Sequence, residues 1–552
     1  MKNRFISSLS ILLCLCLLFS CLLPFAAAEE TGGETGSDTD TGTDSGGDTG
    51  DVPATEPPTI YYHRDPPSLE ENDPNDPDAA QNISGYKLIT DYTGYYRCGF
   101  LFDKRIYQAG TSGNGASITL EYEDGMGWLY FLFDMEYGAY TIVNNDTGEK
   151  ATCGEDLFLH EAIDLVSLFG SPVKSLTVLF ENGPVSILEL YVYTPGYLPD
   201  YVQVWEKPKD GETDLILFST HGDDEQLFFA GLLPYYCALD YEVLVVYMTA
   251  HRGSNTVRFH EMLNGLWGVG VTAYPVCGNF PDFFARNLPE AYTFFLNAGV
   301  TQEDLVGFIT EQLRRYQPMV VVGHDFNGEY LHGQHMAYAE CLAEAVQISS
   351  DPSRYPESAA SWGVWDVPKA YFHLYQENPI VMNWDTPMEE LDGMTPFQVT
   401  QMYGYSQHIS QRESWVSNWI NGFHFNITRA DQIETYSPCQ FGLYRSNVGE
   451  DVAKNDFFEN VVSHVQQAEL DRLAAEEEAR RQEEARIAAE EEARRQEEAR
   501  IAAEEEARRQ AELEAIQAEE AARRKLIFIA AGFGAVLIVV LILIIVLHKH
   551  KR

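Results

Sequence analysis

An uncharged apolar run near the C-terminus, Leu526–Leu547, restricts the fold of this chain more than any other segment. About 20 apolar residues in an α-helix cross the hydrocarbon core of a bilayer, because a helix bonds its own backbone groups there. Basic residues flank the run on both sides, so charge alone does not decide its orientation. The sequence therefore predicts a transmembrane helix at 526–547 and a basic tail at 548–552.

A second apolar run, Ile6–Phe25, follows a basic start and precedes the small residues Ala26–Ala28. This pattern is typical of a secretory signal peptide over residues 1–28, and an uncleaved membrane anchor is the alternative. A signal peptide exports everything that precedes the C-terminal span. We therefore expect a single-pass protein of the cell membrane with its folded part outside the cytoplasm and 548–552 as a cytoplasmic tail.

The segment before the span, residues 466–524, is a charged repeat. Ala474–Ile487 reads AAEEEARRQEEARI, and Ala488–Ile501 repeats it without change. These residues are strong helix formers, and Glu precedes Arg by four positions, as at Glu477 and Arg481. The 14-residue period equals two heptads and favours a coiled coil with self-association, but the apolar seam is mostly Ala. A solitary helical stalk of about 85 Å is the other prediction.

Residues 29–84 are rich in Thr, Gly, Ser, Asp and Pro, which predicts a disordered acidic linker. The chain of 552 residues has a net charge of −47. That charge argues against a nucleic-acid partner, which needs a basic surface, and favours a neutral substrate over a polyanion. With 45% hydrophobic and 12% aromatic residues, the chain still has enough apolar material for folded cores.

Residues 85–205 have the pattern of an all-β domain, because short aromatic and β-branched runs alternate with Gly, Asn and Asp. The sequence predicts a β-sandwich-like domain with strands at 116–122, 128–133, 140–143, 176–180 and 187–193. This layout resembles the jelly-roll modules that bind carbohydrate beside extracellular glycan enzymes. A spacer or packing domain is the alternative.

Residues 209–445 change to strands that alternate with helices. The apolar runs and periodicity predict strands at 214–220, 242–249 and 318–323, and helices at 226–238, 258–267, 301–316 and 333–346. This order predicts an α/β fold with a Rossmann-like, doubly wound, mostly parallel sheet. Ligands of such sheets bind at the carboxyl ends of the strands, so the residues that follow each strand matter most.

Polar, metal-binding side chains follow two of these strands. The first strand leads into His221–Glu225, which reads HGDDE, and the later strand leads into His324–His335, which reads HDFNGEYLHGQH. Two histidines and one carboxylate, with a fourth position for water, form a recurring catalytic zinc arrangement. The sequence therefore predicts an open Zn²⁺ site at this edge of the sheet.

These motifs resemble those of the PIG-L/LmbE-like zinc N-deacetylase family. The first family motif is His-Pro-Asp-Asp-Glu, matched by His221–Glu225, and the later one is Gly-His-Pro-Asp-His after Gly-Glu-Tyr, matched by Gly328–His335. Between them, Arg258–Glu261 is similar to the family's Arg and Glu at a helix start. Tyr405–Gln407, reading YSQ, is similar to its closing feature. The resemblance covers residues 209–445 and implies a deacetylase domain.

The resemblance also implies a role for individual residues. The implied Zn²⁺ ligands are His221, Asp224 and His335. Asp223 would be the general base that takes a proton from water and then the acid that protonates the departing amine. His332 and Tyr330 would stabilise the tetrahedral oxyanion.

The motifs depart from the family pattern at three positions. Gly222 replaces Pro, Leu331 replaces Gly, and Gln334 replaces an Asp that would orient His332. The role of His332 is therefore open, whereas the predicted ligands and base are intact. Glu225 is expected to hold the loop by hydrogen bonds rather than to react.

Six cysteines follow the predicted signal peptide, and an even number outside the cytoplasm permits disulfides. Cys98–Cys153 is the candidate pair within the all-β region, and free buried thiols are the alternative.

Taken with the resemblance, the sequence predicts a membrane-anchored, extracytoplasmic, zinc-dependent hydrolase of linear amide C–N bonds. It would remove the acetyl group from N-acetylglucosamine-type sugars or surface glycans. The alternative is a glycan-binding surface protein whose deacetylase fold is catalytically degenerate.

Overall fold

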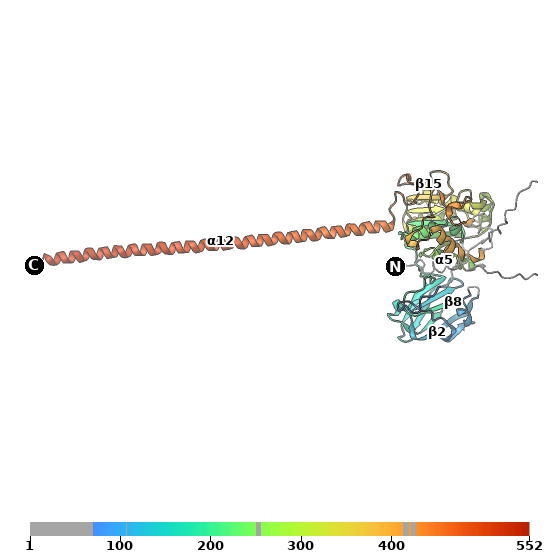
Figure 1. Ribbon diagram of the computed structural model, residues 1–552, viewed down its shortest axis with the longest axis horizontal. Helices are drawn as coiled ribbons and strands as arrows, with labels where there is room; N and C mark the ends of the chain where they lie inside the picture. Colours follow the sequence, from blue (N-terminus) through green and yellow to red (C-terminus); the bar gives the residue numbers. More distant parts are fainter. Residues whose placement is uncertain are drawn as a thin grey trace, which may run out of the picture. The chain divides into compact units, whose positions relative to one another are not determined.

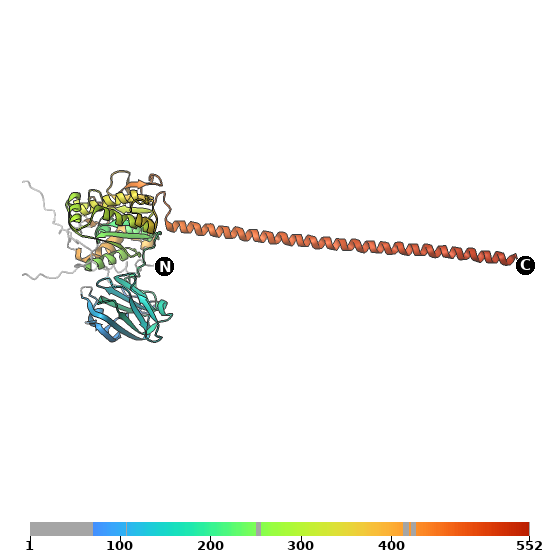
Figure 2. The ribbon, with the colours of Figure 1, turned by 180° about the vertical axis from the view of Figure 1, so that it is seen from behind.

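The computed structural model describes residues 70–95, 97–105, 108–249, 256–411, 419–420 and 427–550. The chain divides into two compact units, residues 1–467 and 468–552. The first unit contains an all-β region and an α/β region, and the second is helical (Figures 1 and 2). The predicted signal peptide and most of the predicted linker lie outside the described residues.

The all-β region is antiparallel throughout its described pairs. Its strands are β1 (Ile89–Tyr95), β2 (Gly110–Met126), β3 (Trp128–Phe133), β4 (Tyr140–Asn144), β5 (Lys150–Cys153), β6 (His160–Asp164), β7 (Val173–Phe180) and β8 (Ser186–Tyr193). The order is β5-β4-β7-β2-β8-β3-β6, with β1 paired to β2. The long strand β2 pairs with β7 over its later part and with β8 at Gly110 and Thr111, so it belongs to both halves.

The two halves enclose a shared aromatic core, as expected of a sandwich. Phe131 from β3 and Phe180 from β7 meet edge to face, with ring centroids 6.3 Å apart. Both side chains are fully buried. The short helix α2 (Leu165–Phe169) follows β6, and Asp164 caps it by accepting a hydrogen bond from the Ser167 N–H.

The last part of the predicted disordered linker is ordered. Residues 70–84 lie along the sandwich, where the Asn72 amide donates to the carbonyls of Ala80 and Tyr197 at 3.0 and 2.8 Å. Ala80 is 1% exposed, and its N–H donates to the Tyr197 carbonyl. The prediction of disorder up to residue 84 was wrong for this stretch, because composition does not register hydrogen bonds to a distant loop.

The α/β region is built on a mostly parallel sheet, as predicted. Its strands are β9 (Leu215–Ser219), β10 (Val243–Thr249), β11 (Val276–Phe280), β12 (Val320–Gly323), β13 (Lys369–His373), β14 (Pro379–Val381) and β15 (Gln440–Ser446). The order is β11-β10-β9-β12-β13-β15-β14, parallel from β11 to β13 and antiparallel beyond. The chain turns from one side of β9 to the other at β12, so the carboxyl ends of β9 and β12 form the switch point.

Helices connect these strands. They are α3 (Asp224–Leu227), α4 (Leu232–Ala238), α5 (Thr256–Gly268), α6 (Leu288–Asn297), α7 (Gln302–Tyr316), α8 (Gly333–Ile348), α9 (Pro356–Trp362) and α10 (Pro396–Val399). Thr301 and Asp304 form the capping box at the start of α7. Short turns of 3₁₀ or π geometry are η1 (Tyr86–Leu88), η2 (Cys98–Phe102), η3 (Glu329–Leu331), η4 (Glu389–Leu391), η5 (Thr400–Gly404), η6 (Tyr405–Gln407), η7 (Ile409–Gln411) and η8 (Ala430–Gln432).

The predicted helix at 226–238 is broken into α3 and α4. Gly231 stands at the break with φ 96°, a left-handed conformation that favours glycine. A Cβ atom there would lie 2.5 Å from Trp384. The single-helix prediction was wrong because the close approach of Trp384 requires this interruption.

The packed α/β region extends past the predicted boundary at 445. Lys369 is fully buried, and its Nζ donates to Asp451 Oδ1 at 2.5 Å. Phe457 and Val461 also belong to the core. The boundary was placed too early because no sequence pattern marks this buried ion pair.

A buried polar link joins the two regions of the first unit. His160 on β6 and His260 on α5 lie with Nε2 and Nδ1 2.7 Å apart, and their rings stack at 5.0 Å. His160 Nδ1 lies 2.6 Å from Gln203 Oε1. The sandwich therefore contacts α5 directly.

Helix α12 (His464–Lys549) contains both the predicted stalk and the predicted span without interruption. Glu–Arg pairs run along it, for example Arg486 Nη1 to Glu490 Oε1 at 2.6 Å. Among the described residues, α12 is the helix long and apolar enough to cross a membrane. Whether it forms a coiled coil stays a prediction.

The described cysteines are all free. The candidate pair Cys98–Cys153 is therefore not bonded, and the structure favours the free-thiol alternative.

Candidate metal and catalytic site

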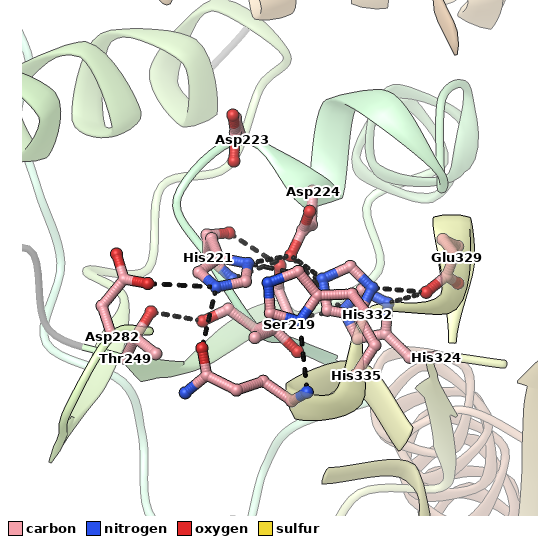
Figure 3. Close-up of polar contacts among 12 residues, drawn as sticks. Ser219, His221, Asp223, Asp224, Thr249, Asp282, His324, Glu329, His332 and His335 are labelled. Atoms are coloured by element: carbon pink, nitrogen blue, oxygen red, sulfur yellow. Dashed lines mark hydrogen bonds and ion pairs between the residues drawn. The ribbon is translucent and has the colours of Figure 1, made fainter. Parts of the chain in front are cut away.

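Three predicted ligands meet at the carboxyl edge of the sheet (Figure 3). His221 follows β9, Asp224 opens α3, and His335 lies in the first turn of α8. Asp224 Oδ2 lies 2.9 Å from His221 Nδ1 and 3.2 Å from His335 Nε2. The two imidazole nitrogens are 3.4 Å apart. All three side chains are buried.

This donor set fits a tetrahedral zinc ion. Ligand bonds of about 2.0–2.1 Å at tetrahedral angles place neighbouring donors about 3.3 Å apart. The spacings in the cluster, 2.9 to 3.4 Å, agree with this value. Two imidazoles and one carboxylate leave a fourth position for water or substrate, as catalytic zinc sites do.

A buried carboxylate orients the histidine ligand on α8. Glu329 is fully buried, and its Oε2 accepts from His335 Nδ1 at 2.6 Å and His324 Nδ1 at 2.9 Å. Its Oε1 lies 2.6 Å from His373 Nδ1. A proton held on His335 Nδ1 leaves Nε2 free to face the cluster, which is how outer carboxylates fix a ligand's tautomer.

Sequence reasoning did not assign His324, His373 or Glu329 a role. His324 comes directly after β12, and His373 is the last residue of β13. The rule that strand ends carry the site would have found His324 after the predicted strand at 318–323, whereas His373 ends a strand that was not predicted. The same rule applied to β11 would have found Asp282, whose Oδ1 lies 3.4 Å from His221 Nε2.

The electrostatics of the cluster favour a bound cation. Burial lowers the pKa of His221, but the carboxylates of Asp224 and Asp282 outweigh it and raise that pKa to about 10. Burial also lowers the pKa of His335, but the carboxylates of Asp224 and Glu329 outweigh it and raise that pKa to about 9. Burial opposes ionisation of Asp224 and Glu329, yet the neighbouring imidazoles hold the pKa of both carboxyls well below their usual range. Ionised buried carboxylates require positive charge, which a divalent cation supplies.

Asp223, the predicted base, lies on the same loop but outside the hydrogen-bonded cluster (Figure 3). It is 4% exposed, and its Oδ1 accepts from Arg258 Nη2 at 2.7 Å. Arg258 is in α5, so a helix outside the motif holds this carboxylate in place. Arg258, which is similar to the family's Arg at a helix start, therefore contacts the predicted base directly.

His332 and Tyr330 border the cluster. His332 Nδ1 accepts from the N–H of Gln334 at 3.1 Å, so in the neutral ring Nε2 carries the proton. Burial, with His335 and His221 nearby, lowers the pKa of His332 to about 2. The Tyr330 ring lies 5.3 Å from the rings of both His332 and His335.

The loop that carries Tyr330 has a strained backbone. Tyr330 and Leu331 have φ values of 45° and 60°. Leu331 occupies the position where the resembled family has Gly, a residue that takes this conformation without strain. Each non-glycine residue here costs about 1–2 kcal/mol, so the surrounding contacts must hold the loop.

Gln334 does not orient His332 through its side chain. Its Oε1 accepts from the Phe283 N–H at 3.1 Å and lies 3.4 Å from His221 Nε2, and its Nε2 donates to the Pro281 carbonyl. The amide thus joins the loop after β11 to a predicted ligand. The expected effect of its substitution on His332 was therefore assigned to the wrong histidine.

Glu225 is buried beside the cluster, but neither of its carboxylate oxygens has a hydrogen-bond partner among the described residues, so the predicted hydrogen bonds to the loop are not formed. Its Oε1 lies 3.4 Å from His408 Nε2. Burial raises the pKa of Glu225. His408 directly follows η6, the turn formed by the YSQ sequence.

Together, the parallel sheet and a two-histidine, one-carboxylate cluster at its switch point define a candidate metal-dependent hydrolase site. Residues 216–346 match a protein-family model described as PIG-L: GlcNAc-PI de-N-acetylase. This match confirms the resemblance that the motifs predicted. The matched segment contains the HGDDE and GEYLHGQH motifs.

Two curated relatives are similar to this chain. A 1D-myo-inositol 2-acetamido-2-deoxy-alpha-D-glucopyranoside deacetylase 1 of Catenulispora acidiphila is 25% identical over 279 residues, which cover 45% of this chain and 83% of the relative. A 1D-myo-inositol 2-acetamido-2-deoxy-alpha-D-glucopyranoside deacetylase 2 of Saccharopolyspora erythraea is 31% identical over 102 residues, which cover 18% of this chain and 35% of that relative.

A solved structure is also similar. The N,N'-diacetylchitobiose deacetylase of Pyrococcus horikoshii is 17% identical, with a TM-score of 0.30. The alignment covers 42% of this chain and 83% of that structure.

Proposed function

We propose that this chain is a zinc-dependent N-deacetylase that hydrolyses the acetamide of N-acetylglucosamine-type sugars or glycans. The observation that carries the proposal is the donor set of His221, Asp224 and His335, spaced for one tetrahedral ion. The PIG-L match and the relatives named as deacetylases support the reaction and the sugar class. The intact predicted base and ligands favour an enzyme over a degenerate binding protein.

Zn²⁺ bound to these donors would polarise the acetamide carbonyl and lower the pKa of water at the fourth position. Asp223, held by Arg258, takes a proton from the attacking water. The carbonyl carbon gains a C–O bond, and the His332 Nε2–H and the Tyr330 hydroxyl donate to the oxyanion. Asp223 returns the proton to the amine nitrogen as the C–N bond breaks, which releases acetate and a free amino sugar.

The substitution Asp223→Asn tests this mechanism. Asn cannot accept and return the proton, so acetate release from N-acetylglucosamine oligomers should fall by about 10²–10⁴-fold while bound zinc is unchanged. Metal content by elemental analysis and acetate by a coupled assay provide the two measurements. Acetate release that survives in Asp223→Asn would disprove the role of this residue, and zinc retained by His335→Gln would disprove the ligand set.

Stoichiometric zinc without acetate release from any acetylated sugar would support the glycan-binding alternative. Glu225→Gln provides a control, because Glu225 is buried next to the site but contacts His408 rather than the donors.

We also propose that α12 anchors the protein in the cell membrane with its folded unit outside the cytoplasm. The apolar part of α12 supports the span, and the N-terminal signal pattern supports the direction. Protease added to intact cells should cleave the folded unit and leave the tail protected. Protection of the folded unit would reverse the assigned orientation.

A further inference from the structure

A hollow of about 380 Å³ opens on the all-β region. Three segments distant in the sequence line it: the ordered stretch that includes Glu71 and Asn82, the loop that includes Phe102 and Lys104, and strand β8. Its volume lies within the range of small-ligand sites. None of the residues in the candidate metal site lines this hollow.

Glu189 of β8 is the most buried polar group of the lining. It is 1% exposed, and its Oε1 accepts from the Arg105 N–H at 2.7 Å. Burial raises the pKa of Glu189 to about 8. The raised pKa favours the protonated carboxyl over a wider pH range than at an exposed glutamate, and a protonated carboxyl both donates and accepts hydrogen bonds.

Tyr191 lies two residues further on the same face of β8 and is 6% exposed. Its ring packs against Tyr130 and Tyr201, with centroids 5.9 and 6.2 Å away. Among the described residues, its hydroxyl has no hydrogen-bond partner. Tyr191 lines the hollow, so this hydroxyl can form a hydrogen bond with a ligand there.

The opposite wall supplies neutral polar groups. The amide of Asn82 donates to Glu71 Oε1 at 2.8 Å and is thereby held in position. Lys104 is the only cation among the described residues of the lining. A lining with one cation and the carboxyl groups of Glu71 and Glu189 disfavours a polyanion, and the described lining contains no cluster of metal-ligating groups.

We propose that this hollow binds a neutral N-acetylated oligosaccharide. A sugar presents hydroxyl and amide groups to Glu189 and Asn82 and an apolar C–H face to the aromatic side chains, so its surface complements this lining. The choice of an N-acetylated sugar rests on the proposed function. A second attachment point on the same glycan raises the effective concentration of substrate at the metal site.

The test uses the full-length protein in detergent with Asp223→Asn to stop turnover, and tri-N-acetylchitotriose as the probe. Calorimetric titration should show two binding events, and Glu189→Leu should remove one of them or weaken it at least tenfold. Glu189→Gln, which keeps a neutral donor and acceptor, should retain both events. Glu161→Leu is the matched control, because Glu161 is a carboxylate of the same region whose partners are Tyr140 and Gly154.

Hydrogen exchange provides a measurement that does not depend on whether Glu189→Leu folds. The probe should protect amides in residues 186–193 of the Asp223→Asn protein. A single binding event, unchanged binding in Glu189→Leu, or no protection of 186–193 would overturn the proposal. Glu189-dependent binding in a protein that never releases acetate would uphold this site and reject the proposed function, whereas normal acetate release with unchanged Glu189→Leu binding rejects only this site.

Discussion

At the scale of single residues, the site depends on two side chains that neither bind the ion nor react in the proposed mechanism. The Glu329 carboxylate lies within hydrogen-bond distance of the imidazoles of His324, His335 and His373. Arg258 donates a hydrogen bond to Asp223. Glu329 and Asp223 are buried and Arg258 is half-buried, so water does not readily replace either contact when it is lost. The geometry of the predicted ligand and base therefore depends on these outer residues.

Glu329→Gln should weaken zinc binding by about 10–100-fold, because an amide holds the Nδ1 proton of His335 less strongly than a carboxylate does. Competition with a chelator measures the zinc dissociation constant. Glu344→Gln is the control, since Glu344 is on α8 with His335 and pairs with Arg354 at the surface. Equal zinc affinity in Glu329→Gln and the parent would contradict the orienting role.

Arg258→Gln should lower kcat by about 10²-fold and leave zinc content unchanged, because it displaces the base but touches no ligand. Steady-state kinetics and metal analysis separate the two effects. Arg315→Gln, which breaks an ion pair with Asp210 away from the site, should leave both unchanged. Loss of zinc together with kcat would show that Arg258 supports the whole loop instead.

At the scale of secondary-structure elements, the break between α3 and α4 places the loop that carries the motif. Gly231 has a positive φ, and Trp384 fills the space where a side chain would stand. The interruption ends α3 one turn after Asp224 and lets α4 take a new direction against β10. A continuous helix would move the start of α3 and with it the donor set.

Gly231→Ala should destabilise the protein by about 2–4 kcal/mol, since it adds overpacking against Trp384 to the strain of a positive φ. Gly299→Ala isolates the strain, because Gly299 has φ 80° with open space around it, and should cost about 1 kcal/mol. Urea unfolding measures both. Equal losses in the two variants would mean that Trp384 moves aside without cost.

At the scale of the whole folded unit, the His160–His260 pair makes the contact between sandwich and α5 sensitive to acid. Burial lowers the pKa of His160 well below its usual range, and His260 adds to the effect. Burial lowers the pKa of His260 to about 4, although Asp134 opposes the shift. Both rings are therefore neutral in the folded state at pH 7.

The free energy of unfolding should fall as the pH drops from about 6.5 towards 4. In this range the two histidines bind protons in the unfolded chain but stay neutral in the folded protein. The expected slope is about 1.4 kcal/mol per pH unit for each histidine that titrates. Unfolding measured between pH 7.5 and 4.5 tests this, and His260→Gln should flatten the curve. A curve of equal slope in His260→Gln would assign the acid sensitivity to other groups.

Much of the α/β fold follows from local patterns in the chain. The run that forms β12 is continuously apolar because that strand is buried on both faces, and Thr301 caps α7 through atoms three residues away. The ligand trio was also predictable, because His221 and Asp224 share one turn and the GEYLHGQH motif contains His335. Their function as zinc ligands stays a prediction until metal is measured.

The sequence by itself therefore determined the strands β9, β10 and β12, the helices α5, α7 and α8, the apolar helix and the residues of the motif, since these depend on neighbours within a few positions. Only the tertiary structure decided that Glu329 orients His335 and that Arg258 holds Asp223. It likewise decided that Gln334 serves His221 and that residues 70–84 are ordered. These contacts join segments far apart in the chain or depend on the directions of side chains in the folded protein. Local sequence patterns therefore do not predict them.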